Sequence, residues 1–204
     1  MTPPPVYESD PRVADVRARL GAAHTASERP TEKAAAKLDS QHKLYVRDRL
    51  ALLLDDGRIA ISALALGLIT RMREEATAYA RTRTAFGRPI GVNQGVSFPI
   101  ADLAVMEDTA RLLTYRAAWL KDEQESGRRS VAEVKQAAAV AKLYTSEAAV
   151  SATRIATQVF GGNGFMEEYP VARFYRDAKI LEIGEGTSEV QRMVIAKGLG
   201  LPTA

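Results

Sequence analysis

An alanine-rich run at residues 130–155 predicts a long helix that packs closely against other helices. Ser130 and Glu133 have the spacing of a capping box, which begins a helix. Small side chains on a helix face allow a second helix to approach closely. The apolar positions recur every three or four residues, as on one face of a helix, and are Val134, Ala138, Ala141, Ala148, Ala152 and Ile155.

Four other regions have helical spacing, and we expect Trp119 to lie in the core. A helix from residue 59 to about Arg83 should bury Ile61, Leu64, Leu68, Met72 and Tyr79. A helix that stops near Ser126 should bury Ile100, Leu103, Met106, Ala110, Leu113, Ala117 and Leu120. An amphipathic stretch precedes Gly184, and a last helix follows Gly186. Strand patterns are nearly absent, so the predicted fold class is all-α, an antiparallel helical bundle.

Composition excludes several classes of protein. The 204 residues are 46% hydrophobic and 26% charged, which is typical of a soluble globular protein. The 28 basic residues exceed the 25 acidic ones only slightly and are scattered, which argues against nucleic-acid binding. There is no cysteine, and His24 and His42 are the only histidines, so we expect no disulfide and no metal site. Neither a membrane-spanning run nor a signal peptide is present, and the expected location is the cytoplasm.

Residues 1–57 differ in character from the rest of the chain. The N-terminal prolines and polar residues 22–30 indicate loops. A later apolar stripe ends at Asp55-Asp56-Gly57, where Gly57 suits the position after a helix end. We therefore predict two parts: a partly disordered arm with short helices at residues 1–57, and a helical-bundle domain at residues 58–204.

Residues 173–192 contain the strongest candidate for chemistry, Glu185. It lies between Gly184 and Gly186, just before a helix that Thr187 and Ser188 open. The glycines permit a sharp turn, and the helix start points free N–H groups and a positive dipole end toward the carboxylate. The helix start favours the anion and burial under a substrate favours the acid, so Glu185 could serve as a general base near neutral pH. The same local pattern also fits an ordinary capping turn.

Further motifs follow one another in order along the chain. They are R-T-A-F-G-R-P-I at residues 83–90, Q-V-F-G-G-N-G-F at 158–165, E-Y-P at 168–170, R-D-A-K-I at 176–180 and E-G-T at 185–187, with Gln191-Arg192 behind. Together they resemble the C-terminal domain of flavin-dependent acyl-CoA dehydrogenases, over residues 58–201. The resemblance implies a helical bundle and the α,β-dehydrogenation of an acyl-CoA thioester in fatty acid metabolism.

The resemblance also implies a base. Glu185 matches the base that many members carry at the E-G-T motif. Some members place the base on the first helix of the domain, but residues 59–68 contain no acid. Glu182 and Glu189 are the nearby alternatives, for which surface charge or capping is the better interpretation. Arg176 and Asp177 are better interpreted as a structural ion pair that positions the turn.

FAD is the cofactor that the resemblance implies. Its expected contacts are Arg83 at the pyrophosphate, Phe86 against the cofactor, Gln158 and Gly162 from the adjoining subunit, and Thr187 and Glu189 near the adenosine end. The arginine offers a fork of donors, and glycine lets the backbone come close. Taken alone, the G-G-N-G stretch also fits a tight turn, and Arg83 a solvated helix end.

Acyl-CoA dehydrogenases usually place an N-terminal helical domain and a middle β-domain before this bundle. We expect half of the pocket to come from another polypeptide, in a homo-oligomer or a heteromer, with electron-transfer flavoprotein or a similar acceptor as partner. The alternative is a non-catalytic, truncated or fused remnant that serves as an oligomerisation or interaction module. Residues 41–57 are similar to the N-terminal segment of acyl-CoA carboxylase carboxyltransferase subunits, without that family's CoA-binding loops; a helical packing arm is the alternative there.

Overall fold

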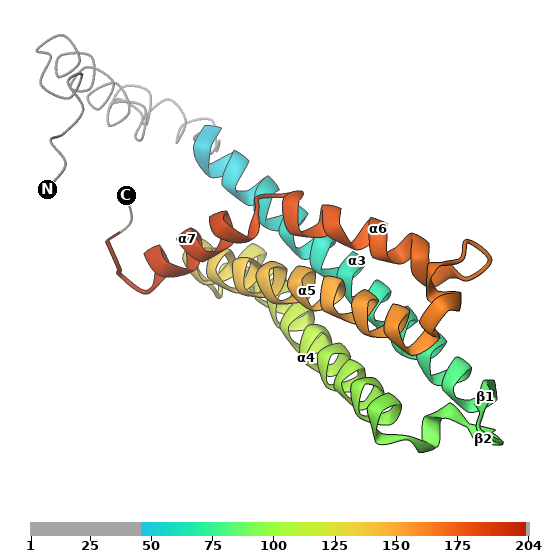
Figure 1. Ribbon diagram of the computed structural model, residues 1–204. Coiled ribbons are helices and arrows are strands. Elements are labelled where there is room, and N and C mark those ends of the chain that lie inside the picture. Colours follow the sequence, from blue (N-terminus) through green and yellow to red (C-terminus); the bar gives the residue numbers. More distant parts are fainter. Residues whose placement is uncertain (1–45, 203–204) are drawn as a thin grey trace, which may run out of the picture. The chain divides into compact units, whose positions relative to one another are not determined.

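The computed structural model describes residues 46–202, with side chains from Asp55 onward. This part contains five α-helices and one small hairpin (Figure 1). The helices are α3 (Val46–Thr82), α4 (Gln94–Glu125), α5 (Val131–Phe160), α6 (Pro170–Ile183) and α7 (Ser188–Gly198). Strands β1 (Thr84–Ala85) and β2 (Arg88–Pro89) pair, and 3-10 turns η2 (Ile90–Val92) and η3 (Gly161–Phe165) follow β2 and α5. The predicted all-α bundle is confirmed; residues 1–45 of the expected arm lie outside the described part.

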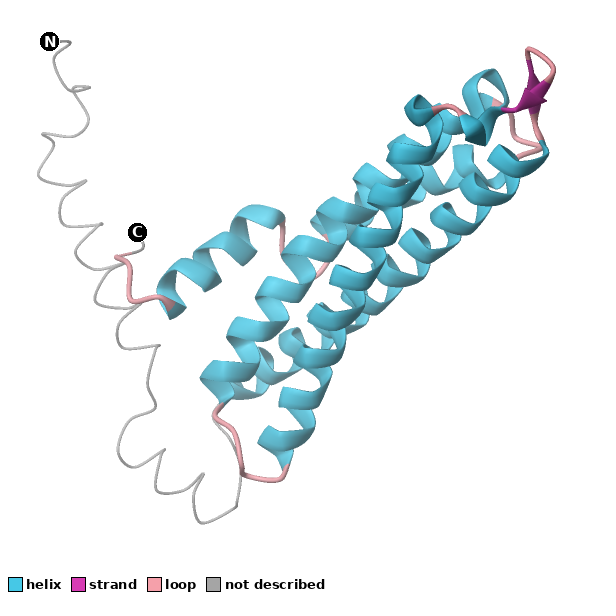
Figure 2. Cartoon of the chain, turned by 90° about the horizontal axis from the view of Figure 1, so that it is seen from below, coloured by secondary structure: helices cyan, strands magenta, loops and turns pink. Residues whose placement is uncertain are grey.

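Helices α3 to α6 run alternately in opposite directions (Figure 1), and Figure 2 shows the long helices lying side by side. Lys121, near the end of α4, forms an ion pair with Asp56, near the start of α3, at 3.0 Å between Nζ and Oδ1. Phe160 at the end of α5 and Val171 at the start of α6 belong to one core cluster. None of the helices within residues 46–202 has both the length and the apolar character needed to cross a membrane.

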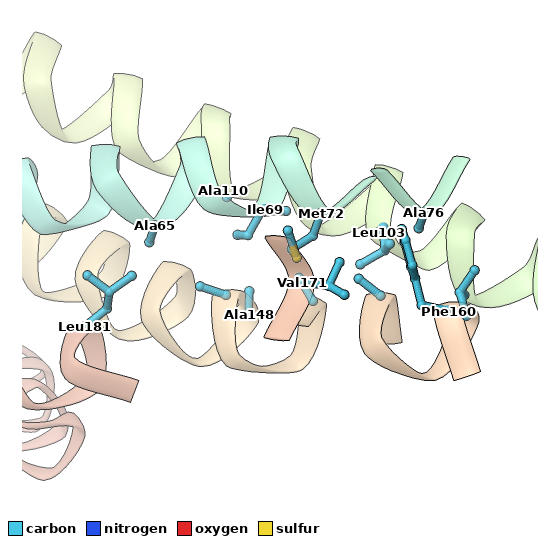
Figure 3. Close-up of a cluster of buried hydrophobic side chains, with 14 of the residues drawn as sticks. Ala65, Ile69, Met72, Ala76, Leu103, Ala110, Ala148, Phe160, Val171 and Leu181 are labelled. Atoms are coloured by element: carbon cyan, nitrogen blue, oxygen red, sulfur yellow. The ribbon is translucent and has the colours of Figure 1, made fainter. Parts of the chain in front are cut away.

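The alanines of α5 lie in the core, as their spacing predicts. Of the predicted alanines, Ala138, Ala141 and Ala152 are fully buried and Ala148 is nearly so. Figure 3 shows Ala148 in the core cluster that also contains Ile69 of α3, Leu103 of α4 and Val171 of α6. Ser130 and Glu133 form the predicted capping box: Ser130 N–H donates to the Glu133 carboxylate at 3.0 Å, and Glu133 N–H donates to Ser130 Oγ at 3.3 Å. These hydrogen bonds fix the start of α5.

Two predicted core positions are wrong. Leu64 is 62% exposed, and the buried seam of α3 passes instead through Ala65, Ile69 and Met72. At Leu64 and Leu68, the buried seam is thus displaced by one residue, to Ala65 and Ile69. Trp119 is 50% exposed, and the Arg129 guanidinium lies over its ring at 5.6 Å.

The predicted helix end at Gly57 is also wrong. Helix α3 is continuous from Val46 to Thr82 and passes through Gly57. Its other end, expected near Arg83, is confirmed. A glycine inside a helix costs about 0.5–1 kcal/mol relative to alanine, so its presence there asks for a packing reason.

A buried carboxylate joins α3 to α4. Glu107 of α4 accepts hydrogen bonds from Arg73 of α3 and from Arg111, one turn further along α4. Burial alone would raise the pKa of Glu107, but the hydrogen bonds from Arg73 and Arg111 hold it below its ordinary value. Glu107 therefore stays ionised, and the pair of arginines fixes the register of the two helices.

Candidate active site

The turn between α6 and α7 holds Glu185 in an uncommon backbone conformation. Its φ is 54°, and that of Gly186 is 91°. Gly184 has an ordinary φ of −60°, so the left-handed pair is Glu185 and Gly186, not the two glycines that flank the acid. A left-handed non-glycine residue costs roughly 1–2 kcal/mol and persists only where its surroundings hold it.

Gly186 is required by its neighbours. A Cβ at this position would lie 2.8 Å from Nε2 of Gln191 and 3.2 Å from Cγ1 of Val190. Thr187 then caps α7, with its side chain accepting a hydrogen bond from Val190 N–H at 3.5 Å, so the predicted helix start is confirmed.

The side chain of Glu185 lies over α3 at Gly57. A Cβ on Gly57 would stand 2.6 Å from Cδ of Glu185 and 3.1 Å from its Cγ. The glycine inside α3 thus leaves room for the Glu185 carboxyl. The only sequence signal for this contact is a glycine within the acidic-basic run D-D-G-R, which suggests a helix end just as well.

Two buried side chains donate hydrogen bonds to the backbone carbonyl groups around Glu185. Lys142 of α5 donates from Nζ to the carbonyl oxygen of Glu182 at 3.2 Å and to that of Gly186 at 2.6 Å. Gln191 of α7 donates from Nε2 to the carbonyl oxygens of Glu185 at 3.1 Å and Gly186 at 2.9 Å. Both side chains are fully buried. The sequence alone indicates no role for Lys142, because a lysine in a helix is ordinarily exposed to water.

The lysine lies in a buried polar environment. Burial lowers the pKa of Lys142, and the charge of nearby Glu182 acts against this effect. On α3, Asp55 and Arg58 form a buried ion pair that flanks Gly57. Burial raises the pKa of Asp55, although Arg58 opposes the rise. Charged groups therefore underlie the Glu185 turn on the α3 and α5 sides.

The competing acids have other partners. Glu182, in the last turn of α6, forms an ion pair with Lys179. Glu189 lies in the first turn of α7, where a hydrogen bond with Thr187 holds the pKa of its carboxyl below the ordinary value. Glu185 and Glu189 are both exposed, but only Glu185 lies on the turn itself, between the two helices.

Arg83 and Phe86 lie at the other end of α3, around the hairpin. Arg83 is exposed just beyond the helix, and its carbonyl accepts from Ile90 N–H at 2.9 Å. Phe86 and Gly87 form the two-residue turn between β1 and β2, with φ of 52° and 79°. Positive φ at both positions suits such a hairpin but is unusual for phenylalanine. The Phe86 ring is fully exposed and so available to a neighbouring molecule.

Gln158 borders an open groove at this same end, and Gly162 lies in η3, just after α5. The groove has a volume of about 630 Å³, and its charged and amide side chains are Arg154, Gln158, Glu167 and Arg176. The buried Oγ1 of Thr157, which also lines it, has no hydrogen-bond partner within residues 46–202. A Cβ on Gly162 would meet nothing within 4 Å, so its backbone is open to a ligand.

The expected ion pair between Arg176 and Asp177 is wrong. Arg176 pairs instead with Glu167, at 3.9 Å. Adjacent residues in a helix point in different directions, and α6 contains both members of the expected pair. The residues that hold the Glu185 turn are Lys142 and Gln191.

The predicted site residues form two groups at opposite ends of the bundle (Figure 1). Tyr79 stacks on Phe160 with ring centroids 4.0 Å apart and accepts a hydrogen bond from Asn163 at 2.8 Å, which joins the Arg83 end of α3 to the turn that contains Gly162. Glu185 contacts α3 at Gly57, about 25 residues before the helix ends at Thr82. At about 1.5 Å per residue, the groups are about 38 Å apart. Within one chain, Glu185, Thr187 and Glu189 are thus separated from Arg83, Phe86, Gln158 and Gly162.

Known proteins are similar to this chain over the described bundle. The probable acyl-CoA dehydrogenase YngJ of Bacillus subtilis is 47% identical over 146 residues, which cover 72% of this chain and 37% of that protein. Butyryl-CoA dehydrogenase from Megasphaera elsdenii has a structure with a TM-score of 0.68 and 41% identity, covering 74% of this chain and 38% of that one. PigA, whose structure contains FAD and proline, has a TM-score of 0.66 and 32% identity, covering 72% and 37%.

These similarities concern one domain, since this chain spans little more than a third of the length of YngJ. The match to the family model starts at residue 48, inside the segment 41–57 for which carboxyltransferase similarity stays a prediction. Residues 48–200, three quarters of the chain, match the model of the acyl-CoA dehydrogenase C-terminal domain, and the chain belongs to the acyl-CoA dehydrogenase family.

Proposed function

We propose that this chain supplies the catalytic base of a flavin-dependent acyl-CoA dehydrogenase, and that the base is Glu185. The observation that carries the proposal is the way the backbone of Glu185 is held, with its side chain directed at Gly57. Its backbone is left-handed, its side chain occupies the space that Gly57 leaves on α3, and its neighbouring carbonyls are engaged by buried donors. A surface glutamate without a function has no need of so restricted a position.

In the proposed reaction, a carboxylate oxygen of Glu185 takes the α proton of an acyl-CoA thioester. Such a base must be ionised and within hydrogen-bond reach of the carbon that loses the proton. It must also be shielded from water, because a hydrated carboxylate is a weak base. Glu185 is exposed on the bundle, so another polypeptide segment has to cover it. A bound flavin would supply the acceptor for the β hydrogen, which leaves as hydride.

The residues at the groove are suited to FAD. Arg154 and Arg176 can pair with phosphate oxygens, and Gln158 and the unpartnered Thr157 hydroxyl can bind polar atoms of the dinucleotide. Arg83 and Phe86 would contribute from the hairpin, and Gly162 would let the backbone approach. Thr187 and Glu189 would contact a flavin dinucleotide near its adenosine end. Because these groups lie at opposite ends of the bundle, we propose that each flavin is held by two chains.

An exposed stripe on α4 provides a surface for a second copy. Phe98, Val105, Leu112 and Trp119 recur every seven residues and are 50–71% exposed. In an antiparallel pair of α4 helices centred between residues 108 and 109, Phe98 would face Trp119 of the partner helix and Val105 would face Leu112. Exposed Asp102 and Arg116 would then lie near each other with opposite charge. The stripe is thus self-complementary, which is the requirement of a twofold interface.

We expect Leu112→Glu to break this assembly. The glutamate would be buried against Val105 of the second copy without a partner, and twice per interface, so the dissociation constant should rise at least about a hundredfold. Sedimentation velocity over a range of concentrations measures the change. Leu199→Glu is the matched control, since Leu199 is 69% exposed and lies beyond α7. If the Leu112 variant assembles like the wild type, α4 is not the interface.

The electron acceptor and the N-terminal segment complete the proposal. Family membership favours electron-transfer flavoprotein or a similar flavoprotein as acceptor. The carboxyltransferase-like residues 41–57 would bind a carboxylase partner or act as a packing arm.

Flavin content and turnover of the purified assembly test the proposal. We expect the chain to co-purify with the polypeptide that covers Glu185, to carry FAD, and to oxidise butyryl-CoA with an artificial electron acceptor. Butyryl-CoA is the probe because one of the similar structures is that of a butyryl-CoA dehydrogenase. A colourless assembly that oxidises no acyl-CoA would instead support the alternative, an oligomerisation module without catalysis.

A further inference from the structure

We propose that Lys142 is a positioning residue for Glu185, whose ammonium group fixes the turn that carries the base. The inference rests on the proposed function, since it concerns the residue proposed as base. No sequence motif singled out this lysine, and it does not touch the Glu185 carboxyl.

Lys142 donates hydrogen bonds to backbone groups before and after the proposed base. Its two acceptors are the carbonyl of Glu182, at the end of α6, and the carbonyl of Gly186, directly after Glu185. Lys142 itself belongs to α5, which packs against α4, α6 and α7 and forms the centre of the bundle. The ammonium group therefore ties both sides of the turn to the central helix of the domain.

The chemistry of the acceptors explains a cation at this place. The last carbonyl groups of a helix have no partner within the helix, and the C-terminal end of the helix dipole favours positive charge. Glu182 contributes such a carbonyl from the last turn of α6. A fully buried lysine is rare unless its charge is used, because its desolvation is costly. An apolar residue would fill the same space at lower cost, so the hydrogen bonds to the turn account for the lysine.

Gln191 completes the restraint from the other side. Its amide donates to the carbonyls of Glu185 and Gly186, so Gly186 accepts from both Lys142 and Gln191. The peptide groups before and after Gly186 are thereby oriented. This arrangement fixes the left-handed conformation of Glu185 and aims its side chain at Gly57.

Hydrogen exchange of the full-length chain tests the restraint without any activity. In Lys142→Met the side chain keeps its length but loses its donors. We expect amide exchange in residues 184–191 to accelerate about tenfold to a hundredfold, as befits the loss of hydrogen bonds from a charged donor. Peptides from α3 and α4 should keep their wild-type protection. Lys135→Met is the matched control, since Lys135 is half-buried on α5, two turns before Lys142, and it should leave the turn unchanged.

Two further variants decide the remaining outcomes. Lys142→Arg keeps the charge and the donors and should restore part of the protection. If Lys142→Met fails to fold, Gln191→Met removes the other donor to Gly186 and should also accelerate exchange in the turn. Wild-type exchange in the turn of a folded Lys142→Met protein would overturn the proposal, and so would wild-type exchange in Gln191→Met if the lysine variant does not fold.

Kinetics of the reconstituted enzyme separate this proposal from the proposed function. A displaced base should lower kcat about a hundredfold, with KM for butyryl-CoA and flavin content unchanged. An equal loss in Lys135→Met, or a loss confined to flavin content, contradicts a positioning role. If the turn loosens in Lys142→Met but the wild-type assembly has no activity, the restraint stands and the proposed function fails.

Discussion

Glu185→Gln is expected to reduce acyl-CoA turnover about a thousandfold in the reconstituted assembly. Glutamine has nearly the same shape but cannot accept the α proton, and a positioned general base contributes about a hundredfold to ten-thousandfold to the rate. The amide still fits beside Gly57, and the hydrogen bonds of the turn involve backbone atoms that the substitution leaves in place. Flavin stoichiometry and thermal stability should therefore stay at wild-type values. Single-turnover bleaching of the flavin absorbance after mixing with butyryl-CoA measures the effect.

Glu182→Gln is the matched control for this experiment. Glu182 lies near the turn, has no assigned contact with the cofactor, and forms an ion pair with Lys179. The variant should retain turnover within about tenfold of the wild type, since Glu182 does not touch the proposed reacting atoms. If Glu185→Gln keeps its activity, or if Glu182→Gln loses it entirely, the base has been assigned to the wrong residue.

The fold could be predicted from the sequence wherever a helix contains its own start signal and a clear apolar face. The capping box at Ser130 marks the start of α5, and its alanines mark the buried face. The predictions that were wrong concern side chains whose burial depends on packing against other helices. Leu64 and Ala65 are equally compatible with a helical pattern, and which of them is buried depends on how α3 packs against the rest of the bundle. Trp119 is apolar, but it belongs to the exposed stripe of α4.

The candidate site was predictable only in part. Glu185, between two glycines and before a helix, can be recognised locally. The residues that hold it are far away in the sequence and carry no local signal. Lys142 looks like a solvated lysine until α6 packs against α5, and Gly57 looks like a helix end until Glu185 is placed on α3. Ordinary residue types acquire these roles through tertiary contacts, which periodicity does not encode.

The contact between Gly57 and Glu185 suggests a variant in which stability and activity change in opposite directions. Gly57→Ala should stabilise α3, because alanine favours a helix interior by about 0.5–1 kcal/mol over glycine. The new Cβ would lie 2.6 Å from Cδ of Glu185, so the carboxyl has to move. Since Glu185 is exposed and its side chain is flexible, it can move at little cost to the fold.

Turnover in Gly57→Ala should consequently fall about a hundredfold, the effect of a reacting group displaced by about 1 Å, while the midpoint of thermal unfolding rises by a few degrees. Gly67→Ala provides the control, because a Cβ at Gly67 of α3 meets nothing within 4 Å. It should gain the same helix stability and lose no activity. The comparison isolates the steric contact, since both variants make the same chemical change in the same helix. Full activity in Gly57→Ala would mean that the Glu185 carboxyl works from a position away from α3, and the site geometry proposed for catalysis would have to be abandoned.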